Sequence, residues 1–171
     1  MNTGHLMKIL IVGASLLLSM ACSAQPITRP KVPESVMVSN AGGPVSLVSV
    51  LDGKRTMVLA VEAGSSKAST WTEQLKSSQA ASARGHTVVM LVYAPQQKSK
   101  ADQLIQSSPG IRFVEDPGLA AMQALKLPGL PAMLGIAADG TIAWQQMGDL
   151  PGARSVVDVI DSWMKLPVRK P

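Results

Sequence analysis

The chain has 171 residues, of which 46% are hydrophobic and 3% aromatic, and it carries a formal net charge of +5. This length and apolar content suit one domain with its own aliphatic core rather than two. The positive charges are scattered and no aromatic residues interleave with them, so we expect no nucleic-acid partner.

The first part of the chain has the pattern of a signal peptide. Lys8 precedes an apolar run from Ile9 to Met20, and small residues follow around Cys22. A charged start, an apolar stretch and a small-residue cleavage site are the three parts of a secretory signal. The run is shorter than the roughly 20 residues that a membrane-spanning helix needs. We therefore predict a signal peptide over residues 1–21 and an exported chain.

The segment Ser19-Met20-Ala21-Cys22 resembles the lipobox of bacterial lipoproteins. The resemblance implies that the Cys22 thiol receives a diacylglycerol group and holds the mature chain on a membrane of the bacterial cell envelope. Ser23 stands where an Asp would favour retention in the inner membrane, so the expected location is the outer membrane, facing the periplasm. The alternative is cleavage after Ala24, which would release the chain without an anchor.

Cys22 is the only cysteine in the sequence. If it is lipidated, the folded domain contains no thiol, which excludes a disulfide, a thiolate nucleophile and a cysteine-based metal site. The methionines outside the signal region are spread through the expected core elements, so we interpret them as core packing rather than copper ligands. We expect neither a metal nor a cofactor.

Three parts follow the signal peptide. Residues 22–34 are rich in proline and poor in apolar residues, which is typical of an extended tether. Residues 35–166 form the predicted domain, and residues 167–171 form a short basic tail.

The apolar periodicity of the domain predicts its elements in chain order. We expect a hairpin from residues 36–39 and 45–50, further strands over 56–61, 87–93, 111–114, 132–136 and 141–147, and helices over 68–83, 100–106, 119–125 and 153–164. The run TVVMLVY is continuous, as in a strand buried on both faces. This order predicts an α/β fold with a mixed sheet and helices on both faces.

Two stretches are similar to thioredoxin-fold proteins of the TlpA/ResA and peroxiredoxin-related group. They are PVSLVSVLDGKRTMVLAV and IRFVEDPGLAAMQALKLPGLPAMLGIAADGTIAWQQMG, and the resemblance spans about residues 35–166. It implies a thioredoxin-like mixed β-sheet flanked by helices, with an N-terminal β-hairpin.

The redox motif of that family is occupied by serines in this chain. In the family the first core strand leads into Trp-Cys-x-x-Cys at a helix N-terminus, where the helix dipole lowers the pKa of the first thiol. The resemblance places Ser66-Lys67-Ala68-Ser69 over Cys-x-x-Cys, so Ser66 and Ser69 stand at the redox positions. We expect Ser66 or Ser69 to cap the helix and Lys67 to be a solvated residue of its first turn.

Pro131 matches the cis-proline of the same family. In the family this proline lies beside the redox pair and leaves the preceding backbone, here that of Leu130, free to pair with an extended substrate. The resemblance thus implies a peptide groove at Leu130 and Pro131. The alternative is a trans proline that closes a loop.

Two further polar residues bear on the chemistry. His86, the only histidine after the signal peptide, is expected at the start of a central strand, opposite the redox loop, so we do not expect a Ser–His hydrolase. Glu62 ends a core strand. It is either a buried carboxylate with a raised pKa that transfers protons, or a residue that reaches solvent or a nearby lysine.

The resemblance and the serines together predict a redox-inactive module that binds or scaffolds a peptide or protein partner. The alternative is a thiol-disulfide oxidoreductase or a peroxiredoxin-related enzyme that acts through the cysteines of a partner.

Overall fold

A computed structural model of the chain describes residues 29–77, 85–150, 152 and 154–167. The predicted signal peptide, Cys22, most of the tether, the second half of the helix expected over 68–83 and residues 168–171 lie outside these ranges. Among the described residues, no helix is long and apolar enough to cross a membrane.

Seven strands form one mixed sheet in the order β2-β1-β5-β4-β3-β6-β7. β3, β4 and β5 are parallel, whereas β6, β7, β1 and β2 each pair antiparallel with their neighbours. The strands are β1 (Met37–Asn40), β2 (Gly43–Ser46), β3 (Thr56–Glu62), β4 (Thr87–Tyr93), β5 (Phe113–Pro117), β6 (Ala132–Ile136) and β7 (Ile142–Met147).

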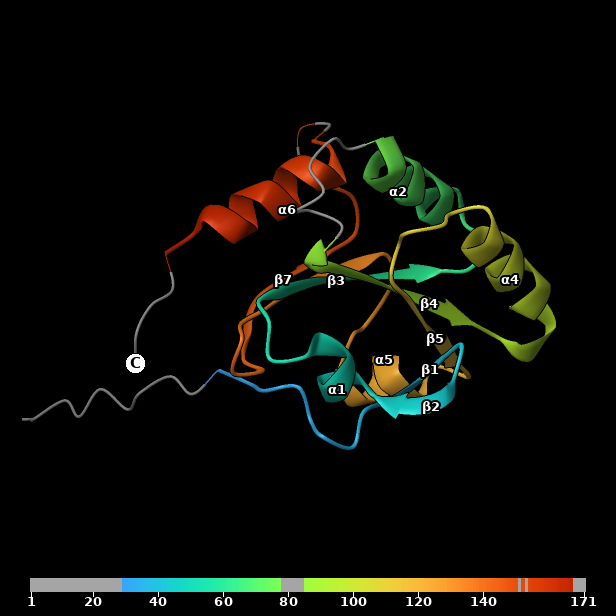
Figure 1. Ribbon diagram of the computed structural model, residues 1–171, viewed down its shortest axis with the longest axis horizontal. Coiled ribbons are helices and arrows are strands. Elements are labelled where there is room, and N and C mark those ends of the chain that lie inside the picture. The colour runs from blue at the N-terminus through green and yellow to red at the C-terminus, as the bar shows by residue number, and fades with distance from the viewer. Residues whose placement is uncertain (1–28, 78–84, 151, 153, 168–171) are drawn as a thin grey trace, which may run out of the picture.

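Helices cover both faces of this sheet, as predicted. Figure 1 shows α2, α4 and α6 on one face and α1 and α5 on the other. Their bounds are α1 (Leu47–Leu51), α2 (Ser66–Ser77), α4 (Lys98–Gln106), α5 (Ala120–Ala124) and α6 (Val156–Lys165), and a 3-10 turn, η1 (Pro95–Gln97), precedes α4.

The core consists of two apolar layers, one on each side of the sheet. Because side chains alternate along a strand, Leu59 of β3 packs in the layer that contains Trp71 of α2. Its neighbour Val58 packs in the other layer, with Leu47 of α1. All seven residues of β4 are buried, which confirms the prediction that this strand is covered on both faces.

The second arm of the predicted N-terminal hairpin is shorter than expected. Residues 45–50 were predicted as a strand, but the strand ends at Ser46 and Leu47–Leu51 is a helical turn. The reason is that β1 begins at Met37, which pairs with Ser46, so no partner strand continues beyond this point. Leu47 and Leu51 are both buried, because residues four apart share one face of a helix.

The last part of the expected tether contacts the domain. The Ile142 amide donates to the Pro30 carbonyl at 2.8 Å, and the Val32 amide donates to the Gly140 carbonyl at 3.0 Å. Val32 is buried in the core. These contacts move the start of the domain from residue 35 to about Pro30, beside the turn between β6 and β7.

The two ends of the sheet differ in the segments that lie there. The α2 end is where β3 ends and α2 begins. The tether end is the opposite one, where Pro30 to Val32 contact the β6–β7 turn.

Candidate functional site

Three segments meet at the α2 end of the sheet. β3 ends at Glu62, and a short turn leads into α2. β6 runs antiparallel to β3 with Ala132 beside Ala60, so the residues just before β6 lie next to the end of β3. The amide of Gly148, after β7, donates to the Pro131 carbonyl at 2.8 Å. The start of α2, the loop before β6 and the end of β7 are therefore neighbours.

Ser65, and not Ser66 or Ser69, caps the start of α2. The Ala68 amide donates to Ser65 Oγ at 3.1 Å, and the Ser69 amide donates to the Ser65 carbonyl at 3.4 Å. Gly64 adopts a left-handed conformation with φ of 82°, which a residue with a side chain would rarely adopt, and this turn brings Ser65 to the cap position. The expected cap was therefore displaced by one residue.

Ser66 and Ser69 are exposed residues of the first turn of α2, three positions apart and thus on one face of the helix. Within the described chain, neither hydroxyl has a hydrogen-bond partner. His86 lies at the tether end, where its Nδ1 is 3.0 Å from the Arg55 carbonyl. The expectation that His86 is remote from the serines is confirmed, and among the described residues no histidine is placed to activate them as nucleophiles.

Lys67 is ion-paired rather than simply solvated. Its ammonium group contacts the carboxylate of Asp149, which follows β7. The side chain of Asp149 is 76% exposed, so this pair contributes little to stability. Its effect is local, because it joins the first turn of α2 to the end of β7 at the border of the site.

The peptide bond between Leu130 and Pro131 is cis, as the resemblance implied, and the alternative of a trans proline is wrong. Both residues are half-buried. Among the described residues, the backbone N–H and C=O of Leu130 make no hydrogen bond to other backbone groups. These groups are thus available for an external partner.

Glu62 is exposed at the end of β3. Its Oε1 accepts a hydrogen bond of 3.1 Å from Gln97 Nε2. The hypothesis of a buried carboxylate is therefore wrong, and the interpretation of a strand-end residue that reaches solvent is confirmed. Its polar partner is a glutamine rather than a lysine.

Asp116 is a buried carboxylate whose role was not recognised from the sequence. It is 1% exposed and lies at the end of β5. Its two oxygens accept hydrogen bonds from the amides of Ala121, at 2.9 Å, and Met122, at 2.8 Å. Asp116 thus satisfies two free N–H groups at the start of α5 and fixes this helix beneath the α2 end. The Asp-Pro-Gly signal indicated the helix start but not the burial of the carboxylate.

A second polar cluster at this end was also missed. The Tyr93 hydroxyl donates a hydrogen bond to Glu115, and Lys98 Nζ lies 3.7 Å from the same carboxylate. Burial of Tyr93 and its hydrogen bond to Glu115 raise the pKa of this phenol to about 12. Phenol and carboxylate come from neighbouring strands: Glu115 pairs with Leu91, two residues before Tyr93, and periodicity alone does not reveal this contact.

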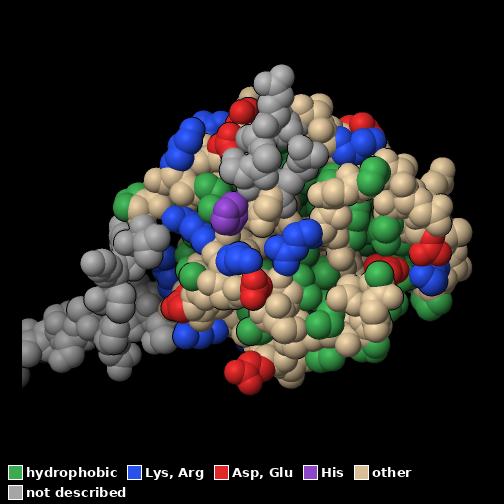
Figure 2. Space-filling view, in the orientation of Figure 1, with side chains coloured by type: hydrophobic (Ala, Val, Ile, Leu, Met, Phe, Trp, Pro, Cys, Tyr) green, Lys and Arg blue, Asp and Glu red, His purple; other side chains and the backbone are tan. Residues whose placement is uncertain are grey.

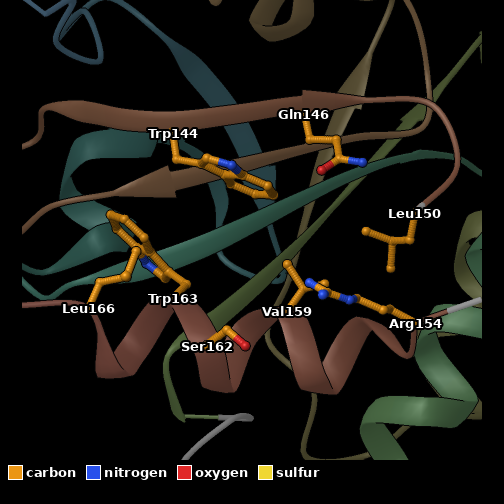
Figure 3. Close-up of a pocket in the computed structure, with 8 residues that line it drawn as sticks. All are labelled: Trp144, Gln146, Leu150, Arg154, Val159, Ser162, Trp163 and Leu166. Carbon is orange, nitrogen blue, oxygen red and sulfur yellow. The ribbon is translucent and has the colours of Figure 1, made fainter. Parts of the chain in front are cut away.

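A hollow of about 240 Å³ lies between β7 and α6 (Figure 3). Two indoles, those of Trp144 and Trp163, face each other across it, and Leu150 and Arg154 lie at its other end. None of Ser66, Ser69, Leu130 and Pro131 lines it. The hollow is therefore a neighbour of the candidate site and not part of it.

The described residues contain no group of three or more His, Cys, Asp or Glu side chains arranged to hold a metal ion. The chemistry available at the site is that of two hydroxyls, an ion pair and free backbone groups. Such groups can bind a ligand through hydrogen bonds.

Comparison with known proteins identifies the fold. No protein-family model matches the chain, and no curated protein matches its sequence. Among solved structures, a secreted Mycobacterium tuberculosis disulfide oxidoreductase homologous to E. coli DsbE is 16% identical, with a TM-score of 0.54, over 74% of this chain and 92% of its own. StoA from Bacillus subtilis is 15% identical, with a TM-score of 0.58, over 80% of this chain and 100% of its own.

A third similar structure is a thiol:disulfide interchange protein from Bacteroides sp. It is 17% identical, with a TM-score of 0.58, over 79% of this chain and 86% of its own. At these identities the similarity concerns the fold. The chain has the thioredoxin-like fold, as the sequence predicted.

Proposed function

We propose that this chain is a redox-inactive, thioredoxin-like binding module of the bacterial cell envelope. The observation that carries the proposal is that the first turn of α2 presents Ser66 and Ser69 and no sulfur, while the only cysteine of the chain is Cys22. Thiol-disulfide exchange requires a thiolate that attacks a disulfide. The α2 end supplies none, so binding is the activity that this site supports.

The partner that suits the site is an extended segment of a peptide or protein. The free backbone N–H and C=O of Leu130 would pair with the main chain of such a segment, as in the addition of a strand to a sheet edge. The exposed hydroxyls of Ser66 and Ser69 would donate hydrogen bonds to its carbonyl groups. The pair Lys67–Asp149 would border the bound segment on the side of β7.

A thiol-disulfide oxidoreductase or peroxiredoxin-related enzyme that borrows the cysteines of a partner is the second candidate. The observation that favours it is the nature of the similar structures, two of which are described as disulfide oxidoreductase or interchange proteins. It requires both thiols to come from the partner, because Ser66 and Ser69 replace those of the chain.

An assay of insulin reduction and peroxide consumption separates the two candidates. The full chain is expected to show no turnover above background, and Cys22→Ser is expected to behave identically. Turnover by both chains would contradict the redox-inactive assignment. Turnover that is lost in Cys22→Ser would show that Cys22 is a free, reactive thiol.

The membrane attachment is part of the same proposal. Cys22 follows a lipobox-like segment and lies seven residues before Arg29, the first described residue. A radiolabelled fatty acid should enter the wild-type chain and not Cys22→Ser. Equal labelling of both chains would remove the lipid anchor from the proposal. The outer membrane is the proposed location, and fractionation of the labelled chain tests it.

A further inference from the structure

Cationic side chains gather at the tether end of the sheet. Figure 2 shows several Lys and Arg side chains around the histidine on the viewed face. The cations of this end lie just before strands, at the end of α6 and on the last part of the tether. They are Arg29, Lys31, Lys54, Arg55, Arg112 and Lys165. Two carboxylates of this end are ion-paired: Asp52 lies 2.5 Å from Lys54, and Asp139 lies 4.0 Å from Lys31. A third, Asp161, lies one turn before Lys165 on α6.

The arginines of this end bind backbone carbonyls and not carboxylates. Arg29 Nη1 donates to the Ala143 carbonyl at 3.4 Å, and Arg55 Nη1 donates to the Leu166 carbonyl at 2.6 Å. Arg112 donates to the Val50 carbonyl. A carbonyl satisfies a hydrogen-bond donor but does not cancel its charge. In the described chain these arginines and Lys165 lie within 4.0 Å of no carboxylate oxygen, and Arg112 is near enough to Asp52 to help lower the pKa of its carboxyl.

The charges of the α2 end have the opposite balance. Lys67 pairs with Asp149, and Lys98 pairs with Asp102 and lies near Glu115. Carboxylates outnumber cations here. The carboxylates are Glu62, Asp102, Glu115, Asp116 and Asp149, and the cations are Lys67, Lys98 and Lys100. The domain therefore has a positive tether end and a negative α2 end.

We infer that the tether end lies against an anionic phospholipid surface. The chain leaves the domain at this end, and Cys22 is only seven residues before Arg29. Even fully extended, seven residues span at most about 25 Å. A lipid anchor at Cys22 thus keeps the positive end of the domain near the bilayer, where anionic headgroups attract Lys and Arg.

An apolar residue lies within the same surface. Leu166 is 52% exposed and directly follows Lys165. An exposed leucine beside cations suits a membrane interface, because the apolar side chain enters the acyl boundary while the charges remain among the headgroups. The resulting orientation points the α2 end, with Ser66 and Leu130, away from the membrane and toward a partner.

The inference goes beyond the proposed binding function and uses its lipid anchor only to hold the chain near the bilayer. It is tested on the full chain, purified in detergent and reconstituted into two kinds of vesicle. One contains phosphatidylcholine alone and the other contains phosphatidylglycerol as well. Lysines are acetylated from the aqueous phase with a water-soluble ester, and each site is quantified by mass spectrometry.

On phosphatidylglycerol vesicles, acetylation of Lys54 and Lys165 is expected to fall by about threefold relative to phosphatidylcholine vesicles, because the tether end is attracted to the charged surface. Lys76 and Lys98, on α2 and α4, serve as internal controls and should be unchanged. High salt should restore the labelling of Lys54 and Lys165, since it screens the attraction.

Equal labelling on both vesicles, or protection of Lys98 instead of Lys54 and Lys165, would overturn the inference.

A second test is flotation with phosphatidylglycerol vesicles. Lys54→Gln/Lys165→Gln should reduce the dependence of vesicle binding on lipid charge, and the matched variant Lys76→Gln/Lys98→Gln should retain it. If Cys22 carries no lipid, Lys54 and Lys165 should still be protected on anionic vesicles, but the chain should not remain bound to neutral vesicles. This result separates failure of the anchor from failure of this inference.

Discussion

The two ends of the central sheet use their polar side chains differently. At the α2 end, charges are paired with charges or with amides, as in Lys67–Asp149 and in the two hydrogen bonds to Asp116. At the tether end, Arg55 and Arg112 satisfy backbone carbonyls and keep their net charge. The α2 end thus carries more carboxylates than cations, and the tether end carries more cations than carboxylates.

This difference fits the proposed role of a redox-inactive binding module that is held on a membrane. The α2 end retains a capped helix start and the free backbone of Leu130, which are binding features. The tether end carries the cations that we propose orient the domain on an anionic membrane. Four predictions test this division.

The largest effect is expected from restoring two thiols at the α2 end. Ser66→Cys/Ser69→Cys should reduce insulin disulfides, whereas the wild-type chain should not, because a helix N-terminus lowers the pKa of the first thiol. The matched control is Ser46→Cys/Ser49→Cys, which has the same spacing at the start of the five-residue helix α1, with Ser46 at the N-cap position. Its rate should be at least about tenfold lower, because a one-turn helix offers little dipole. Equal rates would show that the α2 end has no special geometry for thiol chemistry.

Removing the buried charge at the α2 end should cause the largest loss of stability. Asp116→Asn is expected to lower the free energy of unfolding by about 2 kcal/mol, because one of two charge-assisted hydrogen bonds is lost and an amide is left unsatisfied. The control is Asp52→Asn at the tether end, an exposed residue whose change should leave the stability as it is. Urea denaturation measures both. Similar losses in the two variants would contradict the contrast between the ends.

Tyr93 is the only tyrosine, so its ionisation can be followed directly by ultraviolet absorbance. The midpoint is expected at about pH 12 in the folded chain and near 10 in urea. Since folding raises this pKa, the stabilising effect of Tyr93 is complete below pH 10 and is lost as the pH rises toward 12. Tyr93→Phe should remove this part of the pH dependence. A folded midpoint near 10 would show that the cluster with Glu115 and Lys98 is not formed.

The smallest effect is expected for the ion pair at the border of the site. A double-mutant cycle of Lys67→Ala and Asp149→Ala should give a coupling energy below about 1 kcal/mol, because Asp149 is exposed. The same variants should change partner binding more than stability. A coupling well above this value would show that the pair holds α2 and β7 together.

The sequence predicted the fold through signals that are local and strong. The continuous run of β4 and the Asp139-Gly140 turn between β6 and β7 were visible as patterns of single elements, and the order of the elements sufficed to predict a mixed sheet with helices on both faces. The thioredoxin-like fold came from the resemblance. The match of Pro131 to the cis-proline came from the resemblance. The helix α1 was predicted as part of a strand. The reason is that Leu47 and Leu51, four residues apart, would share one face of a strand as well as one face of a helix.

The site was predicted less completely, because several of its contacts join distant parts of the chain. Asp149 reaches Lys67 across more than eighty residues, and Pro30 pairs with the β6–β7 hairpin across more than a hundred. No periodicity encodes such pairs. The cap by Ser65 is different, since Gly64 directly before it is a local signal of a turn into a helix start.

The most direct test of the binding function is in-cell crosslinking from a photoreactive residue at position 66 or 130, with position 86 at the tether end as the control. The α2 end is proposed to hold an extended segment of a partner, so positions 66 and 130 should give the same protein adduct and position 86 should not. Adducts from position 86 alone would contradict the account, because the partner would then bind the end of the sheet that is remote from Ser66 and Leu130.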